Sequence, residues 1–313
     1  MQHQGYVIVM SNSSKLAVSK VDKSVDLPLL GIMLLLVSTV FFAWQDVITK
    51  QLGTRISVTQ ILVVRFAAFT LFALIYAQRT TGVSTVFKSE FPRLQIVRCL
   101  IMCAEIGIFA YALTFLGVAE IHAIFSCFPL VITALSVPLL GEHVGWRRWL
   151  AVSIGFVGTL IIVQPGAGVF NPAALLALLC VVLYSFYNII TRKVSRQDSF
   201  ETSMVYFGVI GLLASLIAVV GRWQTPDSET ILLLAGICVT SIAGHMLLIK
   251  ALEVTSAVVL QPFNYFILVW AIFLGYLIFG EVLAIHEIIG AIIVVSSGVY
   301  VGVREYRISR SDH

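Results

Sequence analysis

Charged residues are scarce in this chain. Of its 313 residues, 12% are Asp, Glu, Lys or Arg, whereas 59% are hydrophobic. Soluble domains carry roughly 25% charged residues. A single water-soluble core could not bury the apolar surface of a chain whose mean hydropathy is +1.00. The composition therefore excludes a soluble globular protein and indicates that lipid surrounds most of the chain.

Motifs that carry catalysis or nucleotide hydrolysis are also missing. The sequence contains no GxSxG, no HExxH and no Walker motif. All five cysteines lie inside apolar runs without metal-ligand spacing and are interpreted as small apolar residues: Cys99, Cys103, Cys127, Cys180 and Cys238. We therefore predict that the chain is not an enzyme and binds no metal or cofactor. An intramembrane enzyme and a non-transport membrane scaffold are the alternatives.

The basic residues do not form a patch. The formal net charge is +4, but Lys and Arg are spread over short loops, which argues against nucleic-acid binding. With the N-terminus inside, the inner segments hold 16 of these residues and the outer loops hold Lys50, Arg55 and Arg222. Because cytoplasmic loops carry the excess of Lys and Arg, we predict a multi-pass protein of the plasma (inner) membrane with both termini cytoplasmic. Residues 1–27, expected to be disordered, and 305–313 are the predicted cytoplasmic tails.

Ten apolar runs are long enough to cross a bilayer, which takes roughly 20 residues. These runs are 29–49, 58–77, 95–115, 119–139, 148–164, 173–191, 203–221, 230–250, 254–279 and 284–303. They predict an all-α polytopic membrane protein with ten transmembrane helices.

The chain also contains an internal repeat. LLGEHVGWRRWLAVSIGF aligns with IFGEVLAIHEIIGAIIVV at an offset of 139 residues, and WQDVITKQ aligns with FYNIITRK at an offset of 142. We predict two repeats, 29–166 and 173–304, of five spans each. Because five is odd, the second repeat must enter the membrane inverted. Inverted repeats are typical of carriers, in which the two halves open a shared central site to either side. We therefore expect a secondary transporter of a small organic solute that works by alternating access.

This layout resembles the EamA-type, ten-helix branch of the drug/metabolite transporter superfamily over about residues 29–304. The matching motifs are the Gly-Glu pairs closing the fourth and ninth spans, GWRRWLAVSIGFVGTLIIVQPG after the first pair, YALTFLGVAE, and QPFNYFILVWAIFLGYLIFGE. The resemblance implies a central cavity lined by spans 1, 3, 4, 6, 8 and 9. Spans 5 and 10 would be peripheral and available for a homodimer contact. One departure is that the equivalent of Pro129 is Leu268, with the proline at Pro262, so the halves are expected to bend at different depths.

Polar side chains inside the spans are the candidate site residues, because a charge at the bilayer centre costs about 2.5–3.5 kcal/mol on insertion scales. One face of the sixth span carries Tyr184, Tyr187, Asn188 and Thr191, and the equivalent face of the first span carries Phe42, Gln45, Asp46 and Thr49. The predicted substrate-binding residues are Trp44, Gln45, Asp46, Glu105, His122, Ser126, Tyr187, Asn188, His245, Gln261, Asn264 and Tyr265. Helix–helix packing through hydrogen bonds is the alternative for each.

Three of these residues are also proton-coupling candidates: Asp46, Glu105 and His245. The alternative for Glu105 is an internal partner such as Arg65, Arg98 or Tyr111. QPFNY is a candidate broken-helix binding segment, since its proline removes a backbone donor. Glu142 and Glu281, at helix ends after glycine, are expected to hold turns or pair loops.

The charges inside the spans bear on the solute. Arg65 and Lys250 are the cations there, which disfavours phosphorylated or dicarboxylate solutes. Asp46 and Glu105, together with many aromatic residues, favour a neutral, zwitterionic or partly cationic solute with an apolar body. An amino acid, a vitamin such as a flavin, or an adenosyl-type metabolite all fit this description.

Overall fold

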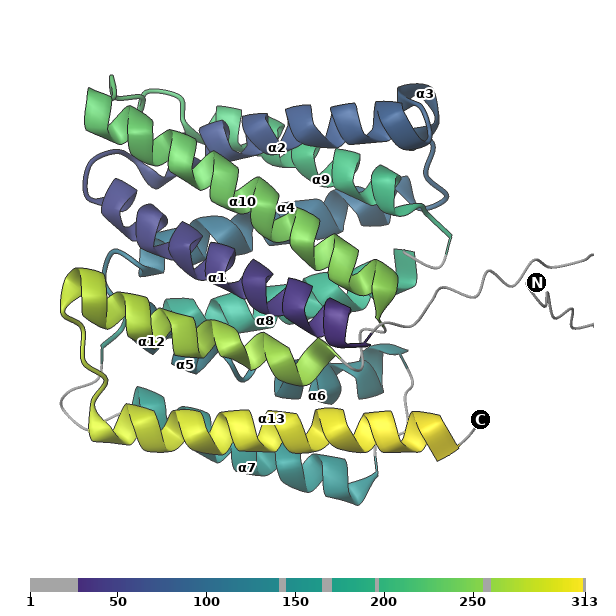
Figure 1. Cartoon of the computed structure of the whole chain (residues 1–313), viewed down its shortest axis with the longest axis vertical. Coiled ribbons are helices and arrows are strands. Elements are labelled where there is room, and N and C mark those ends of the chain that lie inside the picture. The colour runs from purple at the N-terminus through teal and green to yellow at the C-terminus, as the bar shows by residue number, and fades with distance from the viewer. Residues whose placement is uncertain (1–27, 141–144, 165–170, 195–196, 256–259, 312–313) are drawn as a thin grey trace, which may run out of the picture.

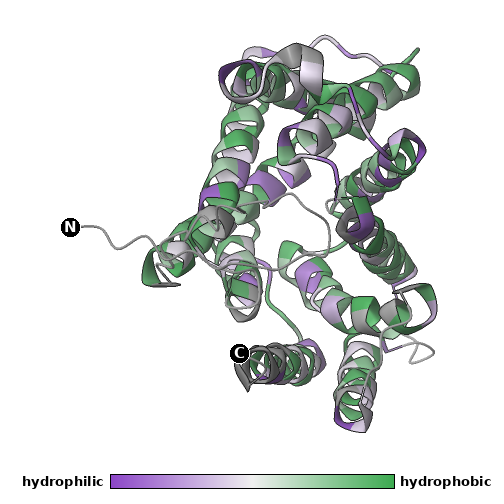
Figure 2. Ribbon diagram, turned by 90° about the vertical axis from the view of Figure 1, so that its right-hand side faces the viewer, coloured by the Kyte–Doolittle hydropathy of each residue, from purple (hydrophilic) through white to green (hydrophobic). Residues whose placement is uncertain are grey.

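The computed structural model describes residues 28–140, 145–164, 171–194, 197–255 and 260–311, and all regular structure within these ranges is helical (Figure 1). The elements are α1 (Pro28–Gly53), α2 (Val58–Thr80), α3 (Val83–Val86), α4 (Pro92–Ala112), α5 (Val118–Phe125), α6 (Phe128–Leu140), α7 (Trp146–Val163), α8 (Ala174–Val194), α9 (Phe200–Ala218), α10 (Ser228–Val254), η1 (Gln261–Tyr265), α12 (Phe266–Phe279) and α13 (Ile285–Ser311). Each predicted span coincides with one helix or with two consecutive helices. By length and composition, α1, α2, α4, α8, α9 and α10 could each cross a bilayer alone. Apolar residues dominate the helices along their length (Figure 2).

The fourth span is broken, whereas the sequence predicted one continuous run. The structure divides it into α5 and α6. Pro129 lies in the first turn of α6, and a proline has no N–H to donate to the carbonyl four residues earlier, here that of Phe125. The helical hydrogen-bond ladder is therefore interrupted at this point.

The ninth span is irregular at the equivalent place. The segment QPFNY forms the 3-10 helix η1, with its proline in the first turn, before α12 begins. The regular helix resumes at Phe128 in one half and at Phe266 in the other, 138 residues apart. The two prolines act from different positions, one inside the resumed helix and one before it. The irregular stretch is residues 126–127 in the first half and includes residues 261–265 in the second, and the different bend depths of the two halves stay a prediction.

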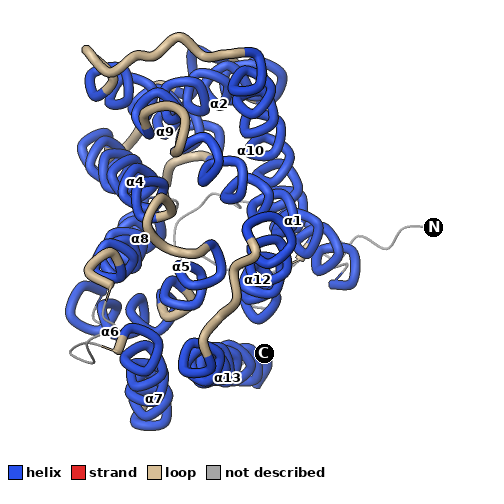
Figure 3. The backbone as a smooth tube through the Cα atoms, turned by 90° about the vertical axis from the view of Figure 1, so that its left-hand side faces the viewer, coloured by secondary structure: helices blue, strands red, loops and turns tan. Residues whose placement is uncertain are grey.

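The two halves pack against each other along their whole length. The principal neighbours are α1 with α10, α4 with α8, α2 with α9, and α7 with α13, and each pair joins one half to the other. Helix α1 of the first half corresponds to α8 of the second, and α4 corresponds to α10. The α1–α10 pair is therefore equivalent to the α8–α4 pair, as expected of a pseudo-two-fold repeat. Figure 3 views these pairs along the bundle, with α4 and α8 opposite α1 and α10.

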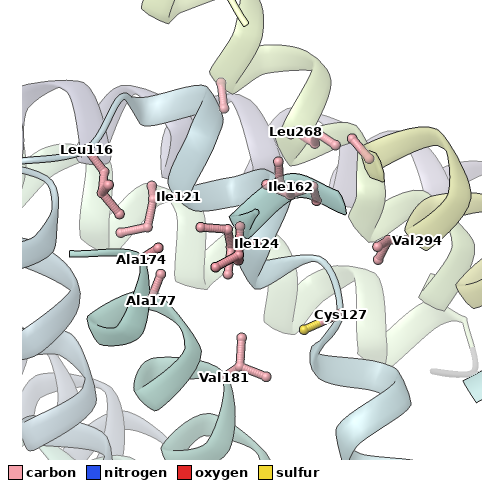
Figure 4. Close-up of a cluster of buried hydrophobic side chains, with 14 of the residues drawn as sticks. Leu116, Ile121, Ile124, Cys127, Ile162, Ala174, Ala177, Val181, Leu268 and Val294 are labelled. Atoms are coloured by element: carbon pink, nitrogen blue, oxygen red, sulfur yellow. The ribbon is translucent and has the colours of Figure 1, made fainter. Parts of the chain in front are cut away.

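Helices α7 and α13 lie at one edge of the bundle (Figure 1), which agrees with the peripheral position expected of spans 5 and 10. They cross closely at Gly158 and Gly290. A Cβ atom added to Gly158 would lie 2.9 Å from the carbonyl oxygen of Gly290, so neither position has room for a side chain. A core of buried apolar residues such as Ile121, Ile124 and Leu268 joins this edge to the centre (Figure 4).

Candidate functional site

The two broken spans face each other across a small pocket. Its walls come from the α5–α6 break and from the η1–α12 junction, and its cavity volume is about 30 Å³. Its lining residues include His122, Phe125, Ser126, Phe128, Asn264 and Tyr265. Four of these were predicted from the sequence as site residues, and the helix breaks bring them together. A cavity of this size holds about two water molecules.

The hydroxyl of Tyr265 has an unusual environment. It is buried and has no hydrogen-bond partner in the part of the chain that the structure describes. Ser126, by contrast, donates its hydroxyl to the carbonyl of Ala123 at 2.6 Å. The Tyr265 hydroxyl lies against Gly298 of α13, where an added Cβ atom would overlap it. An unpaired buried hydroxyl loses about 1–3 kcal/mol of hydrogen bonding.

Asp46 and His122 form a buried pair at the pocket wall. His122 Nε2 in α5 lies 2.8 Å from Asp46 Oδ2 in α1. The His122 ring also packs edge-on against Phe109 of α4, with centroids 5.6 Å apart. This pair therefore ties three helices together beside the pocket.

Gln45 lies next to this pair in the chain and contacts a buried arginine. With its amide oriented to satisfy both neighbours, Gln45 accepts a hydrogen bond from Arg65 at 3.2 Å and donates one to the Ser241 hydroxyl at 3.2 Å. Arg65 is also close enough to both Asp46 and Glu105 to attract them electrostatically. Residues from α1, α2 and α10 thus form one polar cluster with the carboxylate of Glu105 in α4.

Glu105 is 4% exposed. No described residue lies within hydrogen-bond or ion-pair distance of its carboxylate; its backbone carbonyl accepts the thiol of Cys180 at 3.6 Å. Two of the partners proposed from the sequence are placed elsewhere, because Tyr111 is exposed and Arg98 bonds other groups. Arg65 acts on Glu105 only from beyond ion-pair distance.

Arg98 lies near the start of the span predicted over residues 95–115, and the structure buries it in α4. Its guanidinium donates to Gln95 Oε1 at 2.7 Å, to Thr191 Oγ1 at 3.1 Å and to the Ser203 carbonyl at 3.0 Å. Gln95 in turn donates to the Asp198 carboxylate at 2.7 Å. These contacts join α4 to α8 and α9, and no local sequence signal identifies them.

Asp198 lies in the loop between α8 and α9 and anchors this network. Burial alone would raise its pKa. Hydrogen bonds from Ser89, from Gln95 and from the Glu90 N–H outweigh that effect, and they hold the pKa of the Asp198 carboxyl below its ordinary value. The carboxylate therefore stabilises the folded chain as an anion.

The polar face of α8 divides between two surroundings. The Tyr184 ring lies against Phe125 and Phe128 of the pocket, with centroids 5.2 and 5.1 Å away. Tyr187 stacks on Tyr184 with ring centroids 6.1 Å apart, and its centroid lies 5.7 Å from the Arg98 guanidinium. Asn188 donates to the Tyr184 carbonyl of its own helix at 2.7 Å. Tyr184 thus contacts the pocket walls directly, while the predicted residues Tyr187 and Asn188 are joined to the pocket through Tyr184.

His245 and Trp44 lie away from the pocket. His245 Nδ1 lies 2.8 Å from the Ser241 carbonyl, and its ring packs edge-on against Phe42 and Phe69. Trp44 is 41% exposed. It lies two residues before the buried Asp46, which is about 200° of rotation around the helix axis, so the two side chains are on opposite faces of α1. The side chain of Gln261 lies outside the described part of the structure, as does Glu142.

One end of the bundle is closed by a group that we call the Lys50 latch: Lys50, Glu281, Leu116 and Val118. Lys50 Nζ lies 2.5 Å from Glu281 Oε1 and donates to the Leu116 carbonyl at 2.7 Å. Glu281 Oε2 accepts the N–H of Val118, the first residue of α5, at 2.7 Å. The prediction that Glu281 pairs loops is confirmed, and the latch joins the ends of α1 and α12 to the start of α5.

Comparison with known proteins places this geometry in a family. Residues 29–164 and 171–302 each match the EamA-like transporter family. The S-adenosylmethionine uptake transporter of Rickettsia prowazekii is 26% identical over 90% of this chain and 96% of that protein. The riboflavin transporter of Vibrio cholerae is 28% identical over 91% of this chain and 97% of that protein. A solved crystal structure with 18% identity shares the fold, with a TM-score of 0.61 over 90% of this chain and 98% of that chain. The chain therefore belongs to the EamA-like transporter family, and it is a polytopic membrane transporter of small organic solutes rather than an enzyme.

Proposed function

We propose that the chain is a secondary carrier that binds a solute with a planar aromatic body in the pocket between its two broken spans. The observation that carries this proposal is the convergence of Phe125, Phe128, Tyr184 and Tyr265 around the polar groups of Ser126 and Asn264. Aromatic rings stack on planar heterocycles, and the few polar groups orient them.

The named relatives support this class of solute. S-adenosylmethionine and riboflavin, which two of them carry by name, both contain a fused heteroaromatic ring system. Both also carry hydroxyl groups that can bond the Asn264 amide in the pocket wall. An adenosyl-type or flavin-type solute therefore fits the pocket chemistry better than a small aliphatic amino acid.

Transport requires the pocket to open. A cavity of about 30 Å³ is too small for either solute, so α5 and α12 must move apart before one can enter. The Lys50 latch holds the start of α5 to the end of α12 and must release for access from that end. Alternating access then consists of opening this end and the opposite end in turn.

We place the Lys50 latch on the outer side of the plasma (inner) membrane and both termini in the cytoplasm. The excess of Lys and Arg in the opposite loops supports this orientation. In Figure 1, α1 begins and α13 ends on the same side of the bundle, as this orientation requires. Tagging the two tails for access from either side of the membrane tests it.

Binding by the purified protein tests the proposed solute class. S-adenosylmethionine or riboflavin at 100 times its Kd should stabilise the folded protein by about 2.7 kcal/mol and raise its Tm. Asn264→Ala should weaken binding at least tenfold, because it removes a hydrogen-bonding group from the pocket. Trp44→Ala, on the exposed face of α1, is the matched control and should leave the Kd unchanged. If neither solute binds, or if both variants lose affinity equally, the pocket is not the binding site.

A further inference from the structure

The polar cluster around Arg65 contains more negative than positive charge. Asp46 and Glu105 are 9% and 4% exposed, and Arg65 is the guanidinium that attracts both. The Arg65 side chain is hydrogen-bonded to a neutral group, the Gln45 amide, rather than to either carboxylate. Two carboxylates therefore share one cation from a distance.

The other titratable groups that face this cluster do not supply a permanent cation. His122 of α5 is paired with Asp46, and His245 of α10 bonds the Ser241 carbonyl. From α8, Cys180 and Tyr184 lie within electrostatic range of Glu105, and both are neutral in their ordinary state. With neutral imidazoles, the cluster carries one net negative charge. An uncompensated charge this deep in an apolar bundle is unfavourable, so the site favours one additional positive charge.

Glu105 is linked to the pocket through its own helix. One helical turn along α4 from Glu105 is Phe109, whose ring contacts both His122 and Phe125 of the pocket at centroid distances of 5.6 Å. His122, paired with Asp46, lines the pocket itself. The Asp46–His122 pair is therefore the part of the cluster that a cationic group on a solute in the pocket approaches.

We propose that the missing positive charge is supplied in turn by a proton bound to the Asp46–His122–Glu105 cluster and by the cationic group of the solute, so that the carrier exchanges one proton for one monocationic solute. This inference rests on the proposed function and names its solute class. When the solute binds, the proton leaves to water, and the cluster returns to the same net charge. One positive charge moves in each direction, so the exchange is electroneutral.

The exchange predicts that the binding affinity depends on pH for a cationic solute but not for a neutral one. S-adenosylmethionine carries a sulfonium, an ammonium and a carboxylate, for a net charge of +1, whereas riboflavin is neutral. If one proton is displaced, the affinity of the full-length protein for S-adenosylmethionine should rise up to about tenfold per pH unit between pH 5.5 and 8.5. Riboflavin binding should be independent of pH over the same range.

Variants of Glu105 separate a charge effect from a packing effect. Glu105→Gln should weaken S-adenosylmethionine binding at least tenfold and flatten its pH dependence, and Glu105→Asp should restore both. Glu201→Gln, which removes a carboxylate in the first turn of α9, should change neither. Binding to Glu105→Gln with wild-type affinity and pH dependence overturns the proposal. Riboflavin binding without S-adenosylmethionine binding also overturns it, while leaving the pocket assignment intact.

A titration without any solute distinguishes failure of the exchange from failure of the pocket. The purified wild-type protein should take up one more proton between pH 8.5 and 5.5 than either Glu105→Gln or Asp46→Asn. Two variants are compared so that the test still stands if one of them loses its fold, which gel filtration and thermal unfolding detect. Equal proton uptake by the wild type and by both folded variants overturns the exchange, whichever solute the pocket binds.

Discussion

Removing the Lys50 latch should open the bundle at one end. Lys50→Met keeps the length of the side chain and its packing near the Phe279 ring but removes the charge. The lost contacts are the 2.5 Å pair with Glu281 and the 2.7 Å hydrogen bond to the Leu116 carbonyl. Both side chains of the ion pair are 19% exposed, so water screens the pair only in part.

The expected energy follows from these contacts. Hydrogen bonds to charged groups contribute about 1.5–3 kcal/mol each, and water that enters the open state recovers part of this. We expect a net loss of about 2 kcal/mol from the closed state. Because 1.4 kcal/mol is a factor of ten, the equilibrium between closed and open forms should shift about thirtyfold toward the open form.

The assay follows access to the pocket. A cysteine placed at Asn264, in a background without the five native cysteines, reports modification by a hydrophilic thiol reagent. Lys50→Met should raise the modification rate about thirtyfold, and Glu281→Gln should raise it similarly. The double variant should add little, because both changes break the same pair.

A second ion pair provides the matched control. Arg55 and Glu229 lie 2.6 Å apart, but their side chains are 34% and 63% exposed. Exposed pairs contribute about 0–1 kcal/mol, so Arg55→Met should change the rate less than about fivefold. An unchanged rate in Lys50→Met, or an equal rise in Arg55→Met, would refute the assignment of the latch as the barrier at this end.

Three further predictions concern stability and the pocket. Tyr265→Phe removes a buried hydroxyl without a described partner, so it should raise the Tm of the solute-free protein. Gly158→Leu should lower the Tm by several degrees, because the new side chain would clash with the Gly290 carbonyl. Gly107→Ala is the control and should be tolerated, because its Cβ would lie 3.4 Å from a flexible leucine methyl. Asp198→Asn should destabilise the protein at pH 7. Because the folded pKa of Asp198 is lowered, the wild-type stabilisation is present above the unfolded pKa and is lost as pH falls through the folded pKa. The Tm values of the two proteins should therefore converge as the pH falls through that range.

The ten spans and their duplication follow from the sequence, because both depend on local composition. An apolar run of about 20 residues is visible without knowing its neighbours, and five spans per repeat require inversion. The break at residues 126–127 was missed, since hydropathy stays high through it. Pro129 was the available signal, and its missing N–H is the reason that the helix is interrupted there.

The candidate site was predicted residue by residue but not as a set of contacts. Asp46, Glu105, His122 and Tyr265 could be chosen because a polar side chain in a span must face the protein interior. The helical period alone would have separated Trp44 from Asp46, which lie on opposite faces of α1. The sequence therefore predicted which polar residues lie in the protein interior, but not which of them contact each other.

Only the tertiary structure determined which side chains pair with each other. His122 lies 76 residues from Asp46 in the chain, and Glu281 lies 231 residues from Lys50. The hydropathy of α4 cannot reveal that Gln95, Thr191 and Ser203 bond the Arg98 guanidinium. Hydropathy is a property of each segment, whereas charge pairing and the narrow pocket depend on how the inverted halves pack, so those features exist only in the assembled bundle.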